Sequence, residues 1–401
     1  MTPWLTIVGV SLDGTTSFSK RAEIAIQSAV VIVGSTRLLD LLDISHDRRF
    51  VWPSPFSLGI TWLKSMAGQP VVVLATGDPM HYGVGSTLTS AFKSEEYTVL
   101  PAPSSLSLAA ARMGWALQDS ICLSLHGRPL EKLHTVLAPN AQLLILTRDG
   151  SSPAKIIRLL CQTMYSESFV SVLENLGGLN ETRYDLRATN TEIRDFAALN
   201  IVAVKCVLSK DAAYLPTVPG LPDCAFQHDG QLTKREIRSI TIAALTPKPN
   251  ERLWDVGAGC GSVAIEWLRC TPNSKAIAFE HDDKRATIVR NNSLNLNVPH
   301  LEIVTESVPD SLQLYPLPDA IFIGGACSNR QVLETCWMTL RSGGRLVANA
   351  VTIEGQAVLS EWHKKLGGEL INIALSYVKT IGRFRGLQPA LAVMQLRLIK
   401  P

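Results

Sequence analysis

The sequence predicts an α/β protein of two domains. Its 401 residues exceed what one hydrophobic core usually serves. The first half alternates short β-rich runs with helical patterns, which is typical of an α/β domain. The second half contains an apolar strand, three alternating glycines and an amphipathic helix at residues 254–267. A strand that turns directly into a helix through glycines is typical of a Rossmann-like sheet.

The first domain is predicted to cover residues 1–210. Strands and helices are expected over residues 5–10, 20–28, 29–33, 36–42, 71–75, 86–92, 97–100, 142–146, 153–164 and 169–173. Residues 184–188 and 201–208 then have strand patterns with no full-length amphipathic helix between them. This domain is therefore expected to end in an antiparallel region.

Two loops of the first domain are candidates for ligand binding. TGDPMHYGVG, at residues 76–85, follows an apolar strand, and its glycines and prolines predict an irregular loop. Ligands bind in loops at the carboxyl ends of such strands. PAPSSLSLAAARMG, at residues 101–114, begins with two prolines, and Ser104 or Ser105 is expected to cap the helix that follows.

A linker is predicted at residues 211–232, because this stretch contains prolines and little periodicity. The second domain then covers residues 233–401, and Thr233 is expected to cap its first helix. Further elements are expected at residues 276–280, 283–296, 301–304, 320–323, 330–340, 345–350, 353–366, 370–378 and 390–398. Their order fits a seven-stranded sheet whose final pair of strands is antiparallel.

The glycines at 257, 259 and 261 predict a cradle for a ligand. They allow a tight turn, and the helix that follows offers unpaired N–H groups and the positive end of its dipole. The third glycine falls one position too early for the dinucleotide fingerprint. Glu280 ends the next strand, where a carboxylate is placed to bind ribose hydroxyls. The pattern D-x-G-x-G-x-G resembles motif I of the Rossmann-like S-adenosylmethionine (SAM) methyltransferases.

The composition argues against several classes of protein. The net charge is only +3, and no basic field that would attract nucleic acid is visible. The N-terminus lacks the features of a signal peptide, and no apolar run is long enough for a membrane span, so we expect a cytoplasmic protein. The eight cysteines form no C-x-x-C pair and the histidines no H-x-x-x-H spacing, so neither a disulfide framework nor a bound metal is expected.

Longer motifs extend the resemblance to nearly the whole chain. VVVLATGDPMHYGVG, PAPSSLSLAAARMG and ENLGG resemble the tetrapyrrole methylase family, whose fold has two α/β subdomains. LTKREIRS, WDVGAGCGSVAIEW, AIAFEHD, DAIFIGGA and LRSGGRLVANAVTIE resemble its unrelated partner domain in cobalamin synthesis. Fused in this order, the two halves resemble the family of decarboxylating precorrin-6Y C-5,15-methyltransferases.

This resemblance implies SAM-dependent methylation of a corrinoid precursor at C-5 and C-15, with one SAM in each domain. It also implies loss of carbon dioxide from an acetate side chain, which gives precorrin-8. In the family, C-5 methylation is associated with the N-terminal domain, and C-15 methylation and decarboxylation with the C-terminal domain. A homo-oligomer is expected as well.

In the first domain, the resemblance implies SAM contacts at Gly77, Asp78, Tyr82, Gly83, Ser104 and Ser105. Asp78 is also a candidate catalytic residue, and the alternative for it is an Asx-type turn before proline. We expect His81 to be a surface or packing residue. Glu174 and Asn175 either line the cleft or form structural hydrogen bonds. The loop after Gly9 departs from the family pattern, which has a second glycine and a proline there.

In the second domain, the resemblance implies SAM contacts at Asp255, Gly257, Gly259, Gly261, Glu280 and Glu306. Gly324 and Gly325 are candidates to face the methyl group and the substrate, because only small residues permit that approach. Corrinoid precursors carry many carboxylates, so cationic contacts are expected. The candidates are Lys234, Arg235, Arg238, Arg383 and Arg385, and the alternative for each is a solvated face.

Methyl transfer from a sulfonium is an in-line displacement, so the protein mainly positions two reactants and excludes water. An electron-rich carbon of the reduced macrocycle can attack directly, and the conjugated macrocycle can accept the electrons of the decarboxylation. Two alternative functions are a nucleic-acid methyltransferase with an N-terminal recognition domain and a non-catalytic SAM-binding regulator. IGGA replaces the [DNS]-P-P-[YFW] segment that methylases of base amines use, which argues against the first.

Overall fold

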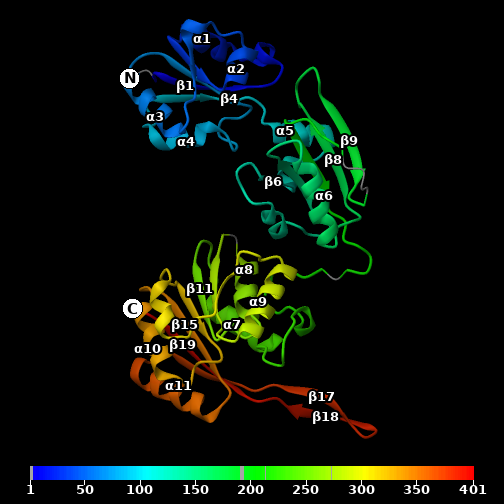
Figure 1. The fold of residues 1–401 in the computed structure, drawn as a ribbon, viewed down its shortest axis with the longest axis vertical. Coiled ribbons are helices and arrows are strands. Elements are labelled where there is room, and N and C mark those ends of the chain that lie inside the picture. Colours follow the sequence, from blue (N-terminus) through cyan, green and yellow to red (C-terminus); the bar gives the residue numbers. More distant parts are fainter. Residues whose placement is uncertain (1–2, 190–193, 213, 272) are drawn as a thin grey trace. The chain divides into compact units, whose positions relative to one another are not determined.

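The computed structural model describes residues 3–189, 194–212, 214–271 and 273–401 (Figure 1). The chain divides between Tyr214 and Leu215 into two compact units. The predicted linker at residues 211–232 falls partly within the second unit, because Leu221 and Phe226 are buried in its core. Position 213 of that linker lies outside the described residues.

The first lobe of unit 1 is a five-stranded parallel sheet in the order β3-β2-β4-β1-β5. Its elements are β1 Leu5–Val10, α1 Lys20–Ser28, β2 Val31–Gly34, α2 Thr36–Leu41, β3 Arg49–Val51, α3 Phe56–Ser65, β4 Val71–Thr76, α4 Val84–Ala91 and β5 Tyr97–Leu100. Along β1, Val8 and Val10 face one core cluster, whereas Leu5 and Ile7 face another. Burial on both faces explains the uninterrupted apolar run of this strand.

The second lobe is a mixed sheet in the order β6-β7-β10-β8-β9. Its elements are α5 Ser105–Met113, β6 Ser120–Ser124, β7 Gln142–Leu146, α6 Ser152–Gln162, β8 Phe169–Glu174, β9 Thr182–Arg187 and β10 Asn200–Lys205. Leu106 of α5 packs on one face of the sheet and Leu160 of α6 on the other. Strands β10, β8 and β9 pair antiparallel, so the predicted antiparallel end of this domain is confirmed.

Unit 2 is built on a seven-stranded sheet in the order β13-β12-β11-β14-β15-β19-β16. Its elements are α7 Arg235–Leu245, β11 Arg252–Val256, α8 Ser262–Cys270, β12 Lys275–Phe279, α9 Asp283–Asn295, β13 Glu302–Val304, β14 Ala320–Ile323, α10 Arg330–Thr339, β15 Arg345–Ala350, α11 Ile353–Leu366, β16 Glu369–Ile373 and β19 Val393–Ile399. Strand β19 runs antiparallel to both of its neighbours, as the predicted final pair requires.

Two local expectations for unit 2 are wrong. The strand expected at residues 370–378 is two strands, because the chain leaves the sheet after β16 and forms a separate hairpin of β17 Ser376–Ile381 and β18 Phe384–Pro389 (Figure 1). Apolar residues continue across the break, so periodicity does not mark it. Thr233 does not cap α7, whose N-cap is Lys234 and has no side-chain cap.

Several elements were not predicted from the sequence. These are α3, β3, β6, β18 and the 3-10 helices Gly14–Ser17, His46–Arg48, Leu117–Asp119, Leu130–Thr135, Asp223–Ala225 and Asp310–Leu314. Within the described residues, no helix is both long and apolar enough to cross a bilayer.

Candidate active sites

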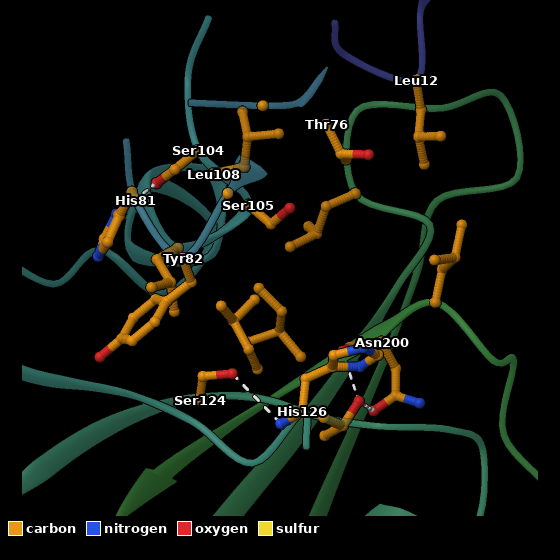
Figure 2. A pocket seen from close by; sticks show the side chains of 18 of the residues that line it. Leu12, Thr76, His81, Tyr82, Ser104, Ser105, Leu108, Ser124, His126 and Asn200 are labelled. Carbon is orange, nitrogen blue, oxygen red and sulfur yellow. Dashed lines mark hydrogen bonds between the residues drawn. The ribbon is translucent and has the colours of Figure 1, made fainter. Parts of the chain in front are cut away.

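The site of unit 1 is a cavity of about 520 Å³ whose wall comes from both lobes (Figure 2). This volume lies in the range of small-molecule sites. The end of β1 meets the loops after β4 and β5 closely: a Cβ on Gly9 would lie 2.2 Å from the carbonyl oxygen of Gly77 and 2.5 Å from the amide nitrogen of Ala102. Gly77 has a φ of +60° and donates a 2.8 Å hydrogen bond to the carbonyl of Val10. Glycine at both positions therefore permits the close backbone contact that forms one end of the cavity.

Of the residues predicted for this site, Gly77, Tyr82, Gly83, Ser104 and Ser105 line the cavity. Ser104 caps α5 as expected, since its Oγ accepts a 3.0 Å hydrogen bond from the amide of Ser107. The cap leaves Ser105 as the first residue of the helix, where its side chain faces the same space (Figure 2).

Asp78 is not among the residues that line the cavity. Its Oδ1 accepts a 2.8 Å hydrogen bond from the amide of Met80, which is the geometry of an Asx turn. The structure therefore favours the turn alternative for Asp78 over the predicted cofactor and catalytic roles.

His81, expected to be a surface or packing residue, lines the cavity instead. Its Nδ1 lies 3.3 Å from Ser104 Oγ, and its ring stacks on Tyr82 at 5.2 Å. The Tyr82 hydroxyl donates a 3.1 Å hydrogen bond to the carbonyl of Cys122 in the second lobe. In the loop after β4, His81 therefore contacts Ser104 at the start of α5 (Figure 2). Tyr82 contacts Cys122 of β6 in the second lobe.

Glu174 and Asn175 do not line the cavity. Glu174 is buried, and its carboxylate accepts hydrogen bonds from the amide of Ala197 at 2.6 Å and the hydroxyl of Thr182 at 3.0 Å. Asn175 donates through Nδ2 to the carbonyl of Asn180. These contacts favour the structural alternative for both residues.

The site of unit 2 lies where β11, β12 and β14 end. Gly257, Gly259 and Gly261 have φ values of +73°, +60° and +77°, which favour glycine. A Cβ on Gly257 would lie 3.0 Å from the amide nitrogen of Gly325. Gly324 also donates a 3.1 Å hydrogen bond to the carbonyl of Val256. The predicted glycines of two distant loops therefore meet backbone to backbone.

Two buried carboxylates lie beside this glycine loop. Asp255 Oδ2 accepts a 3.0 Å hydrogen bond from the amide of Ala264, while Oδ1 has no partner among the described residues. Burial raises the pKa of Asp255 to about 7. Glu280 Oε2 accepts a 2.8 Å hydrogen bond from the amide of Gly259, and Glu280 Oε1 accepts a 3.1 Å hydrogen bond from the backbone amide of Asp282. Helix α8 begins at Ser262, and its N-cap Gly261 provides no side-chain cap.

These features fit a ligand that carries both hydroxyls and a carboxylate. The Glu280 carboxylate can accept hydroxyl hydrogen bonds, and the uncapped start of α8 favours an anion. Glu306 lies on the loop after β13, where it is exposed and accepts a 3.2 Å hydrogen bond from the Tyr315 hydroxyl.

Comparisons with known proteins decide the family. A family described as Tetrapyrrole (Corrin/Porphyrin) Methylases matches residues 4–191, and one described as Precorrin methyltransferase domain matches residues 224–400. A Sinorhizobium precorrin-6Y C(5,15)-methyltransferase [decarboxylating] is 42% identical over 98% of this chain and 96% of its own length. The chain belongs to the precorrin-6Y C5,15-methyltransferase family.

Two shorter relatives each match only part of the chain. A cobalt-precorrin-7 C(5)-methyltransferase of Salmonella typhimurium is 28% identical over 44% of this chain and 87% of its own length. A probable cobalt-precorrin-6B C(15)-methyltransferase (decarboxylating) of Saccharolobus solfataricus is 28% identical over 34% of this chain and 72% of its own length.

Membership of the precorrin-6Y C5,15-methyltransferase family confirms the predicted fold class of both halves and the predicted class of enzyme, a decarboxylating methyltransferase. A methyltransferase family implies SAM as the methyl donor. Among the described residues, no group of three His, Cys, Asp or Glu side chains is placed to hold a metal ion.

Arg238 does not serve the corrinoid substrate of the family as predicted, because its guanidinium is completely buried and fully engaged. Its Nε donates a 2.7 Å hydrogen bond to Glu266 Oε1, and its Nη1 lies 3.3 Å from Asp223 Oδ1. Nη1 also donates to the carbonyl of Thr233, and Nη2 donates to the carbonyl of Leu221. Arg238 therefore holds the segment before α7 against α8, a contact between distant segments that the sequence pattern does not show.

The other predicted cations are exposed. Lys234 lies 3.6 Å from Asp223, and Arg235 begins α7. Arg383 and Arg385 lie on the β17–β18 hairpin. Nothing in their surroundings distinguishes substrate contacts from a solvated face.

Several residues of the unit 1 cavity carried no signal in the sequence. Arg37, Ser124, His126, Arg128, Arg148 and Asn200 line it, although none belongs to a recognised motif. Asn200 is buried and donates 2.7 Å and 3.2 Å hydrogen bonds to the carbonyls of Ala197 and Asp149. These residues come from separate segments, so only the folded chain brings them together.

Proposed function

We propose that this chain methylates precorrin-6Y at C-5 and C-15 with SAM and removes carbon dioxide from an acetate side chain, which gives precorrin-8. The observation that carries the proposal is the presence of two sites of unrelated design, one on each compact unit. Each unit would hold its own SAM.

We assign C-5 methylation to unit 1 and C-15 methylation with decarboxylation to unit 2. The assignment is supported by the shorter relatives, whose names give the C(5) and C(15) activities to separate chains. Two independent sites also explain why a single chain carries two glycine-rich loops that have no sequence similarity.

In unit 2, SAM would supply an electrophilic methyl group on a sulfonium. The Glu280 carboxylate would accept hydrogen bonds from the ribose hydroxyls, and the start of α8 would face the cofactor carboxylate. Gly324 and Gly325 would let the corrinoid approach the methyl group, because neither carries a side chain. The loops would orient the two reactants and exclude water.

In unit 1, the loop of Gly77, Tyr82 and Gly83 and the start of α5 at Ser104 and Ser105 would hold the cofactor. Methylation of a ring carbon that bears hydrogen also requires loss of a proton. His81 is a titratable side chain on the cavity wall and is placed to accept it. The expected homo-oligomer, the cytoplasmic location and the absence of a nucleic-acid partner stay predictions.

The test is to incubate the full chain with precorrin-6Y and SAM labelled with ¹³C in its methyl group. The expected product carries two labelled methyl groups, resolved by NMR at C-5 and C-15, and one equivalent of carbon dioxide is released. Transfer of label to RNA or DNA and not to the corrinoid would refute the proposal, and so would tight SAM binding without any transfer.

A further inference from the structure

The cavity of unit 1 is lined by three arginine side chains that no acidic group among the described residues neutralises. Arg37, Arg128 and Arg148 all line it. Throughout the described parts of the chain, none of the three guanidinium groups has a carboxylate oxygen within 4.0 Å. The described wall of the cavity also contains no aspartate or glutamate. Its charge is therefore positive only, although the whole chain has a net charge of just +3.

The three arginines come from separate parts of both lobes. Arg37 lies on α2 in the first lobe, Arg128 follows β6 and Arg148 follows β7 in the second lobe. The Arg128 guanidinium lies 5.2 Å from the ring centroid of Tyr82, which holds it beside the loop after β4. Convergence of unpaired cations from three segments on one cavity indicates an anionic ligand.

Arg37 has the most constrained position of the three. Its Nη2 donates a 2.9 Å hydrogen bond to Thr76 Oγ1 at the end of β4. Arg37 is exposed as a whole residue, but the surrounding protein desolvates its guanidinium enough to lower its pKa, and no carboxylate among the described residues lies within 4.0 Å to compensate this cost. A partly desolvated cation without a counter-ion destabilises the free protein, but it binds an arriving anion more strongly than a solvated one.

Much of the remaining wall is apolar. Leu12, Leu108, Leu176 and Leu199 reach it from both lobes. Figure 2 shows Leu12 and Leu108 around the same space as Tyr82 and His126. An apolar wall combined with separated cations suits a ligand with an apolar body and several carboxylates at its edge.

We propose that Arg37, Arg128 and Arg148 bind the side-chain carboxylates of the corrinoid and make this site selective for macrocycles with many carboxylates. The inference rests on the proposed function of unit 1. It assigns substrate recognition there to residues outside every recognised motif. A guanidinium can bind a carboxylate through two parallel hydrogen bonds, which also orients the macrocycle in the site.

The first test measures methylation by full-length variants Arg37→Gln, Arg128→Gln and Arg148→Gln, with ¹³C-methyl SAM and limiting corrinoid. We expect kcat/KM for the corrinoid at C-5 to fall on the order of tenfold for Arg37→Gln, because a hydrogen bond to Thr76 holds its guanidinium in place, and about threefold for Arg128→Gln and Arg148→Gln. The KM for SAM and labelling at C-15 should not change. Arg158→Gln is the matched control, because Arg158 is an exposed arginine on α6 that has no ion-pair partner among the described residues and does not line the cavity.

An unchanged kcat/KM for the corrinoid in all three variants of an active enzyme would overturn the inference. A rise in the KM for SAM alone would overturn it as well, because the arginines would then serve the cofactor. Thermal unfolding of each variant separates these outcomes from a loss of folded protein.

A second test does not depend on the reaction, so its failure is distinct from failure of the proposed function. The probes are a tetracarboxylate and an octacarboxylate porphyrin, whose binding to the full chain is followed by porphyrin fluorescence. The unsubstituted chain should bind the octacarboxylate at least about tenfold more tightly, and a variant with all three arginines replaced by glutamine should lose most of this preference. An equal preference in both proteins would refute the role of the arginines even if the enzyme proves inactive on precorrin-6Y.

Discussion

The cavity of unit 1 is lined by three arginines and two histidines, whereas the glycine loop of unit 2 lies beside two buried carboxylates, Asp255 and Glu280. The two sites also differ in how widely their residues are spread along the chain. In unit 1 the wall comes from residues between Val10 and Ile201, while the glycines and acids of unit 2 lie between Asp255 and Glu280, apart from the loop at Gly324.

The difference indicates which reactant each set of residues is built to hold. Carboxylates accept hydrogen bonds from hydroxyl groups and favour cations, which suits the ribose and sulfonium of SAM. Arginines bind carboxylates, which the corrinoid carries in number. On our proposal, the described acids of unit 2 therefore suit the cofactor, whereas the arginines of unit 1 suit the substrate.

The largest effect is expected from Gly257→Val, which should reduce C-15 methylation about a hundredfold or more and leave C-5 methylation intact. The positive φ strains any side chain, and a Cβ would lie 3.0 Å from the backbone of Gly325. Product NMR with labelled SAM measures both positions. Gly343→Ala is the control, because Gly343 has the same φ of +73° but open space around it. Equal loss at both carbons would refute the independence of the two sites.

A second substitution, Asp255→Asn, tests the buried charge of unit 2 through the pH dependence of stability. Because burial raises the pKa of Asp255 to about 7, the folded state keeps its proton at pH values where the unfolded chain, with a pKa near 3.9, has lost it. The protein with Asp255 should therefore lose stability relative to the variant as the pH rises from about 4 to about 7, by up to about 4 kcal/mol. Denaturant unfolding across this range measures the difference.

Asp229→Asn provides the control for that experiment, with the opposite sign. The pKa of Asp229 is lowered, chiefly by its hydrogen bond from Arg285, so its stabilising contribution is present at neutral pH and is lost on acidification. Unfolding free energies of Asp255→Asn that run parallel to those of the unsubstituted protein would contradict a buried, destabilising carboxylate.

The smallest effect is expected from Glu280→Ala, which should weaken SAM binding in unit 2 roughly tenfold to a hundredfold, because a charged acceptor of hydroxyl hydrogen bonds is lost. C-15 methylation at limiting SAM should fall accordingly, while C-5 methylation should not. Glu302→Ala, at the exposed start of β13, is the matched control. A fall at both carbons would show that the two units do not bind SAM independently.

Much of this molecule could be predicted from the sequence because the relevant interactions are local. The turn from β11 into α8 depends on the conformational freedom of three nearby glycines, and the cap of α5 depends on Ser104 and a residue three positions later. The pattern of apolar residues likewise predicted the seven-stranded sheet with its antiparallel end.

Contacts between distant segments required the tertiary structure. The β17–β18 hairpin leaves the sheet without a break in the apolar pattern, and the predicted linker is partly core because its residues Leu221 and Phe226 are buried in unit 2. In the sequence, Arg238 is one of several basic residues near the start of a helix. Only the structure shows that it donates a hydrogen bond to Glu266, 28 positions later.

The sequence by itself therefore determined the family through its motifs, and it determined the glycine turn of unit 2, because short-range backbone geometry is encoded in nearby residues. Only the tertiary structure decided which charges are buried, which are paired and which face a ligand. Arg238 is neutralised by two acids, whereas Arg37, Arg128 and Arg148 meet no carboxylate among the described residues and line a cavity. The free energy of a charge depends on its solvent exposure and on its neighbours in space, and neither can be read from its position along the chain.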